Sequence, residues 1–337
     1  MPELAYENII RDLQNKIYYP VYLLSGEEAF FIDSITSFME DSVLDAMERE
    51  FNQTIVYGLD TNPISLINLS RSYPMSANYQ VVIVKEAQNM KSWAELEKYL
   101  ENPSETTILV FAYKHKDYDK RTRIYKMIKD KGVTYHSKKL YENKVPEWIQ
   151  NHIEKKSLRI QPREAAILAE YLGNDLSRIN NELQKLTINL KKGELITPEI
   201  IEENTGISKD YNVFSLSDAL AERNVFMANR IVQYFIADEK NHSIHGLLPI
   251  LHSFFYKSLV YHQIENKNDK QNVASKLGIH PFLVARHAQC AQNYTPLKLY
   301  HIIGYLKDAD LKVKGVGATN STTQGEILRE MVFKILH

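Results

Sequence analysis

Residues 19–26 read Tyr-Pro-Val-Tyr-Leu-Leu-Ser-Gly, a short apolar run that ends in a glycine. Residues 29–44 follow with apolar and acidic side chains at helical spacing, so the segment predicts a strand, a turn and a helix. Two later runs, Gln80 to Val84 and Thr106 to Tyr113, are rich in β-branched residues and predict buried strands. Strands that alternate with helices favour a parallel sheet covered by helices.

Weaker signals extend this α/β pattern over residues 1–140. Trp93, Leu96 and Leu100 are spaced three and four apart, which predicts a helix between the two later strands. Residues 52–57 and 133–136 would add further strands. We therefore expect the first domain to end near Leu140.

Beyond Leu140 the sequence shows no convincing strand and the apolar spacing becomes helical. One amphipathic stripe repeats at intervals of three and four residues: Leu176, Ile179, Leu183, Leu186 and Leu190. We expect a small helical domain over residues 141–210 and a third, all-helical domain over residues 211–337.

Composition is that of a folded, water-soluble protein. Of the 337 residues, 44% are hydrophobic and 25% are charged, and this length favours two or three domains. The net charge of −1 provides no overall basic field for nucleic acid. The first residues lack signal-peptide character, no apolar run is long enough to span a membrane, and Cys290 is the one cysteine. A cytoplasmic protein is expected.

The turn after the first strand lacks the residues that bind nucleotide phosphates. A phosphate-binding loop needs a second glycine, a lysine and a hydroxyl at fixed spacing from the first glycine. Here Gly26 is followed at that spacing by Phe31, Ile32 and Asp33. Nearby acidic side chains would also repel a triphosphate. Nucleotide binding at this turn, and hence a nucleotide cofactor, is not expected.

A second signature of ATP hydrolysis is also missing. An active site of this type ends its next core strand in an acidic pair that holds Mg²⁺. The matching strand here is followed by Lys85 and Glu86, which puts a cation where the metal-holding aspartate would stand. These residues favour an erased ATPase site, and the alternative is an ordinary α/β domain that has no relation to ATPases.

Residues 72–79, Ser-Tyr-Pro-Met-Ser-Ala-Asn-Tyr, form a loop before that strand. Pro74 stiffens the backbone, and Tyr73 and Met75 offer apolar area that could fill a partner's pocket. Alternatively, Tyr73 and Met75 fold back into the core of their own domain. The residues alone leave both interpretations open.

A basic stretch follows the third predicted strand, and its candidate DNA contacts are Lys116, Lys120, Arg121 and Arg123. Asp117 and Asp119 dilute its charge, so a solvated loop and helix is the alternative. The turn at residues 274–282 resembles that of a helix-turn-helix, but apolar residues open the second helix, which favours packing over DNA reading.

No chemistry-bearing cluster is recognisable elsewhere. His242, His245, His252 and His262 are near one another in sequence but lack a zinc-binding spacing. No Gly-x-Ser-x-Gly elbow or hydrolase triad can be assembled. We expect neither a metal site nor a catalytic site.

In their order and spacing, four segments of the chain resemble the DNA polymerase III δ subunit family. They are residues 21–28; residues 73–87, from Tyr-Pro-Met to Glu-Ala; residues 171–186; and the helices around residues 214–223 and 306–314. The resemblance spans nearly the whole chain and implies an α/β AAA+-like domain with a degenerate nucleotide site, followed by a helical lid-like domain and a helical collar domain.

The resemblance also implies a function. Family members join τ/γ-type and δ′-type subunits in a hetero-pentamer that loads the β sliding clamp on primed DNA. The loop before the second motif inserts an apolar pair into the clamp and helps to open the ring. By position this role falls on Pro74 and Met75, with Tyr73 beside them. The chain would then be a non-catalytic subunit of a DNA-polymerising holoenzyme, acting in DNA replication.

Two other classes of function remain open. An active AAA+ ATPase or helicase-type enzyme would bind ATP as an isolated chain. A DNA-binding regulator that uses residues 274–291 would show sequence-specific DNA binding by its C-terminal domain.

Overall fold

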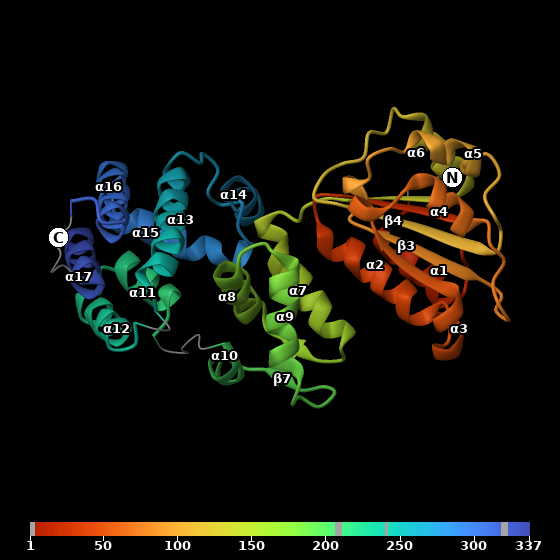
Figure 1. Cartoon of the computed structure of the whole chain (residues 1–337). Helices are drawn as coiled ribbons and strands as arrows, with labels where there is room; N and C mark the ends of the chain where they lie inside the picture. Colours follow the sequence, from red (N-terminus) through yellow and green to blue (C-terminus); the bar gives the residue numbers. More distant parts are fainter. Residues whose placement is uncertain (1–3, 206–210, 240–241, 318–322) are drawn as a thin grey trace. The chain divides into compact units, whose positions relative to one another are not determined.

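A computed structural model of the chain describes residues 4–205, 211–239, 242–317 and 323–337. It divides into two compact units, Met1–Leu140 and Tyr141–His337, drawn from red to yellow and from yellow-green to blue in Figure 1. The boundary predicted at residue 210 lies outside the described residues. Each unit is treated below by itself.

The first unit is built on a five-stranded parallel sheet with the strand order β2-β3-β4-β1-β5. The strands are β1 (Val21–Gly26), β2 (Gln53–Tyr57), β3 (Gln80–Lys85), β4 (Thr107–Lys114) and β5 (Val133–Ser137). The central strands β1, β3 and β4 are buried over most of their length, as expected of apolar runs that are covered on both faces. The predicted parallel α/β sheet is confirmed.

Helices cover both faces of this sheet (Figure 1). The core on one face contains buried residues of α1 (Tyr6–Gln14) and α2 (Ala29–Ser42). The core on the other face contains those of α4 (Pro63–Ser70), α5 (Glu97–Leu100) and α6 (Arg123–Lys131). A further short helix, α3 (Ala46–Asn52), leads directly into the edge strand β2.

Two local predictions are corrected by the structure. The helix expected around Trp93 is a 3₁₀ turn, Ala94–Leu96, followed by the single turn of α5, although Leu96 and Leu100 are buried. Strands do recur after Leu140: β6 (Arg159–Ile160) pairs in parallel with β7 (Leu195–Ile196). These strands are two residues long, too short to leave an alternating pattern in the sequence.

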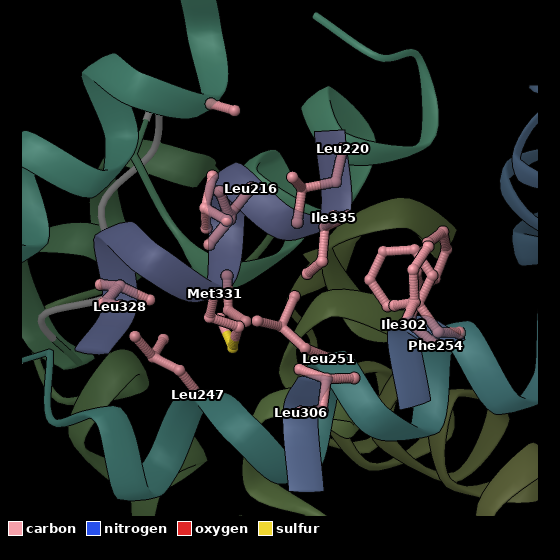
Figure 2. Close-up of a cluster of buried hydrophobic side chains, with 14 of the residues drawn as sticks. Leu216, Leu220, Leu247, Leu251, Phe254, Ile302, Leu306, Leu328, Met331 and Ile335 are labelled. Atoms are coloured by element: carbon pink, nitrogen blue, oxygen red, sulfur yellow. The ribbon is translucent and has the colours of Figure 1, made fainter. Parts of the chain in front are cut away.

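The second unit is otherwise helical. Its α-helices are α7 (Val145–Lys155), α8 (Pro162–Leu172), α9 (Leu176–Thr187), α10 (Pro198–Thr205), α11 (Val213–Ala221), α12 (Val225–Ala237), α13 (Ile244–His262), α14 (Lys270–Leu277), α15 (Val284–Asn293), α16 (Pro296–Val313) and α17 (Gln324–Leu336). Figure 2 shows the largest apolar core of the unit, in which Leu251 and Phe254 of α13 meet Ile302 of α16 and Met331 of α17. No helix among the described residues is both long and apolar enough to cross a membrane.

Candidate functional site

The carboxyl edge of the sheet is where open α/β sheets bind their ligands. Strand β4 lies between β1 and β3, so the ends of these three strands are neighbours there. Gly26 ends β1, Lys114 ends β4 and Lys85 ends β3. The ends of the strands to which the sequence assigned a degenerate nucleotide site are therefore neighbours, and we call this part of the carboxyl edge the nucleotide corner.

Gly26 packs closely against the neighbouring strand. Its φ is 137°, and a Cβ atom added there would lie 2.1 Å from the carbonyl oxygen of Ser137 on β5. The backbone N–H of Glu28 donates to that same oxygen at 3.3 Å, and Ser137 Oγ donates to the Glu28 carbonyl at 2.7 Å. These bonds draw the turn tightly onto β5, whereas a phosphate-binding loop keeps its N–H groups open to the ligand.

The first turn of α2 carries its own anion. Glu28, which is 8% exposed, caps the helix by accepting a hydrogen bond from Phe30 N–H at 3.2 Å. The carboxylate therefore occupies the positive end of the helix dipole, where a phosphate would bind. Phe31 packs on the ring of Tyr6, with centroids 4.9 Å apart, and Ile32 is fully buried. Phe31 and Ile32, which stand at two positions of a phosphate-binding loop, therefore pack in the hydrophobic core instead.

Lys114 connects the two acidic residues of the corner. Its Nζ lies 2.6 Å from Glu86 Oε1 and 3.1 Å from Asp33 Oδ1. Its backbone N–H donates to Gln88 Oε1 at 2.9 Å. The Lys114 side chain is only 15% exposed, so these ion pairs are shielded from solvent more than most surface pairs. A protein cation fills the space between the ends of β1 and β3.

The pKa values of the pair reflect this contact. Burial alone would raise the pKa of Glu86, but hydrogen bonds from Lys114 and Gln88 outweigh it and lower that pKa. Burial likewise opposes the charge on Lys114, yet its bonds to Glu86 and Asp33 raise its pKa above the ordinary value. Both groups are charged at neutral pH, and the carboxylates that could hold Mg²⁺ are bound to an ammonium group.

Lys85 and Glu86 point in different directions. Lys85 Nζ lies 2.8 Å from Glu40 Oε1 on α2, while Glu86 adopts a left-handed backbone conformation with φ of 51° and turns to Lys114. The sequence assigned the cation of this corner to Lys85, whereas in the structure Lys114 makes the contact. Sequence reasoning missed Lys114 because its role depends on the order of the strands.

The loop that contains Tyr73 and Met75 lies at the opposite, amino edge of the sheet, since it directly precedes β3. Tyr73 is 86% exposed and Met75 is 65% exposed, so the alternative in which they fold back into the core does not hold. The flanks of the loop are fixed. Tyr79 packs edge-on against Tyr18 with centroids 5.2 Å apart, and the carbonyl of Ser70 accepts a hydrogen bond from Thr107 Oγ1 at 2.9 Å.

Asn52 holds the centre of this loop. Its side-chain Oδ1 accepts a hydrogen bond from Met75 N–H at 2.5 Å, and its Nδ2 donates to the Met75 carbonyl at 3.0 Å and to the Glu48 carbonyl at 3.0 Å. Asn52 is the last residue of α3 and is 2% exposed. The Met75 backbone is therefore fixed while its side chain remains in solvent, a preorganised arrangement for contact with a partner.

Two of the four candidate DNA contacts are paired with carboxylates, so the four do not form a purely basic surface. Arg121 makes a bidentate contact with Asp119 at 2.9 and 3.0 Å. Arg123 lies 3.0 Å from Glu97. Lys116 lies over the ring of Tyr113, and Lys120 is exposed. The carboxylate partners weaken the attraction of both arginines for phosphate, so the DNA contact remains a prediction.

In the second unit, the turn resembling a helix-turn-helix is part of the packing. Gly278 ends α14 in a left-handed conformation, and Leu283 and Val284, which open the following helix, are buried with Leu277. A recognition helix needs that first turn free to meet base edges. Among the described residues, no group of three or more His, Cys, Asp and Glu side chains lies close enough together to hold a metal ion.

Comparison with known proteins indicates the family of the chain. Family models of the DNA polymerase III delta subunit and of its C-terminal domain match residues 22–138 and 210–328. The DNA polymerase III subunit delta of Bacillus subtilis (strain 168) is 23% identical over 318 residues, which cover 91% of each chain.

A solved structure, the Bacillus subtilis DNA clamp loader delta protein, matches with a TM-score of 0.60 at 20% identity and covers 98% of this chain and 99% of that one. The expected fold class, an α/β domain with a parallel sheet followed by a helical region, is confirmed. Because the two family models together match more than half of its residues, the chain belongs to the DNA polymerase III delta subunit family.

Proposed function

We propose that this protein binds the β sliding clamp through the Tyr73–Met75 loop and favours its opened ring, so that partner ATPase subunits of the clamp loader can place the clamp on primed DNA. One observation carries the proposal: Tyr73 and Met75 are exposed, while Asn52 fixes the Met75 backbone from within the fold. Apolar side chains held rigidly in solvent are suited to fill a partner's pocket.

The helix cap and the ion pairs at the nucleotide corner support a binding role for the subunit. Glu28 caps the helix that would receive a phosphate, and Asp33 and Glu86 are joined to Lys114. Energy for loading then comes from ATP bound by the partner subunits. This chain contributes differential affinity: it shifts the clamp toward the opened ring only by as much as it binds the open form more tightly than the closed one.

The substitution Met75→Asp tests the contact. An aspartate in an apolar pocket leaves a desolvated charge without a partner, so we expect clamp affinity to fall by about 100-fold or more. The measurement is calorimetric titration of the purified chain with its cognate β clamp, without nucleotide. The control is Ile64→Asp, which puts the same charge on an exposed apolar residue. Ile64 lies at the start of α4, which follows the carboxyl end of β2, whereas the loop lies at the amino edge of the sheet.

Opening is tested separately from binding. Two fluorophores placed across the clamp's subunit interface report the separation of the ring, and the wild-type chain should increase that separation whereas Met75→Asp should not. Unchanged clamp affinity for Met75→Asp, or saturable ATP binding by the isolated chain, would contradict the proposed function.

A further inference from the structure

Helix α3 presents two large apolar side chains to solvent. Met47 is 82% exposed and Phe51 is 68% exposed. They are four residues apart and so lie on the same face of the helix. The helix is well defined despite its length, because Asp45 and Glu48 form a capping box at its start. Large apolar residues gathered on an exposed face mark an interaction site.

This face adjoins the loop of Tyr73 and Met75. Strands β2 and β3 are paired in parallel, with Gln53 opposite Val81, and α3 leads into β2 just as the loop leads into β3. Both segments therefore lie at the amino edge of the sheet. Asn52, the residue after Phe51, joins them through its two hydrogen bonds to the Met75 backbone. We call Met47, Phe51, Tyr73 and Met75 together the α3–loop surface.

The size of a stable interface argues that the loop does not act alone. Each partner in a stable protein complex buries about 800 Å², whereas one large side chain contributes roughly 150–250 Å². Tyr73 and Met75 fall well short of that area. Met47 and Phe51 are the nearest addition across the Asn52 link, and the exposed carboxylates Asp45 and Glu50 flank them as a polar rim.

We propose that α3 forms the second half of the sliding-clamp contact. Met47 and Phe51 lie against an apolar area of the clamp beside the pocket that receives the loop, and Asn52 is the positioning residue that fixes the two halves relative to each other. The acidic rim of Asp45 and Glu50 faces basic residues of the clamp. This inference rests on the proposed function, because it takes the clamp as the partner.

Aspartate substitutions separate the two halves of the surface. We expect Phe51→Asp to weaken binding of the purified β clamp by about tenfold or more, and Met47→Asp by less, since a single buried aromatic anchor often dominates a contact. Ile64→Asp should leave affinity within twofold. All three side chains are exposed, so the melting temperatures of the variants should stay close to that of the wild type.

The outcomes also distinguish this inference from the proposed function. If Met75→Asp abolishes clamp binding while Phe51→Asp and Met47→Asp leave it within twofold, α3 lies outside the contact and the inference is wrong, although the proposed function stands. If none of the three changes affinity, the clamp is not bound at this surface and both are wrong.

A double-mutant cycle tests the role of Asn52. If Asn52 acts by positioning Met75, Asn52→Ala should weaken clamp binding strongly in the wild type. In a Met75→Ala background, the fold-loss of affinity caused by Asn52→Ala should be less than half as large. A general loss of structure would lower affinity equally in both backgrounds, and that result would overturn the positioning role. Thermal unfolding curves, recorded for all four proteins, give the folded fraction at the temperature of the titration, and each affinity is corrected by that fraction.

Discussion

Lys114 Nζ lies 2.6 Å from Glu86 Oε1, at the carboxyl edge of the sheet, where open α/β sheets bind their ligands. The same ammonium reaches Asp33 on the first turns of α2. An internal cation thus joins the ends of β3 and β4 to the helix that follows β1. The chain's own charges therefore close the nucleotide corner.

Replacing Lys114 by Met should destabilise the first unit. The change leaves Asp33 and Glu86 close together without their shared cation, and we expect a loss of about 1–3 kcal/mol in the free energy of unfolding. Urea unfolding followed by tryptophan fluorescence measures it. In a Trp148→Phe background the signal comes from Trp93, which packs on Phe111 in the first unit.

The matched control is Lys85→Met, one strand away. Lys85 makes a single ion pair with Glu40 and is about twice as exposed as Lys114, so we expect a loss of less than about 1 kcal/mol. Equal losses for the two variants would show that Lys114 has no special role at the corner.

Acid sensitivity of the second unit should depend on His287. This residue is 2% exposed, its Nδ1 lies 2.9 Å from Ser258 Oγ, and burial, reinforced by Arg286 and Lys257, lowers its pKa to about 3. Below its ordinary pKa near 6.5, the unfolded chain takes up a proton that the folded chain does not. The free energy of unfolding should therefore fall as the pH decreases from about 6.5 toward 3, by up to about 1.4 kcal/mol per pH unit.

Substitution of His287 by Gln removes the titrating group and keeps an amide that can bond to Ser258. The variant should show a flatter dependence of unfolding free energy on pH between about 6 and 4, measured by urea titrations at several pH values. His245→Gln, at an exposed position of the same helical unit, should retain the wild-type slope. A His287→Gln slope equal to that of the wild type would contradict the assignment.

The core of the fold is predictable from the sequence because buried parallel strands are apolar on both faces. The run from Val21 to Leu24 and the run from Gln80 to Val84 carry that signal, and the structure places both in the central strands. The turn at residues 94–100 is different. Its apolar spacing matches a helix, yet only one α-helical turn forms, because periodicity reports which side chains are buried and not the length of the element.

The site was only partly predictable, for a topological reason. The sequence indicated that Phe31 and Ile32 cannot serve a nucleotide, since residue type decides that point. It could not assign Lys114 to the corner, because this requires β4 to lie between β1 and β3. Nor could it place Asn52 beside Met75, 23 residues away in the chain, without the pairing of β2 with β3.

Gly26 should tolerate no side chain. A Cβ atom would lie 2.1 Å from the Ser137 carbonyl oxygen, which is backbone and cannot swing aside, and the φ of 137° is unfavourable for other residues. We expect Gly26→Ala to cost about 2–4 kcal/mol of unfolding free energy. Gly304→Ala, in the middle of α16 with open space around the added methyl group, should instead stabilise by about 0.5–1 kcal/mol. Tolerance of alanine at position 26 would mean that the turn is not drawn onto β5.

Loss of Arg286 should weaken the packing of α8 and α11 against α15. Its guanidinium contacts Asp218 at 2.5 Å and Glu170 at 3.3 Å, and it lies over the ring of Phe254 at 5.1 Å. Burial raises the pKa of Glu170, and the charge of Arg286 acts against that rise. Removing the arginine alone strands a partly buried carboxylate, so we expect Arg286→Met to cost about 3–5 kcal/mol by urea unfolding.

The double variant Arg286→Met/Glu170→Gln separates charge from shape. If the cost arises mainly from the stranded carboxylate, the neutral amide should recover a large part of the lost stability. Removing both charges of a buried ion pair costs less than leaving one charge buried without its partner. If the cost arises instead from the planar geometry of the guanidinium and its position on Phe254, the double variant should be as unstable as Arg286→Met. In that case Arg286→Lys, which keeps the charge, should also be less stable than the wild type. With Trp93→Phe as background, the fluorescence of Trp148 confines the measurement to the second unit, where all of these contacts lie.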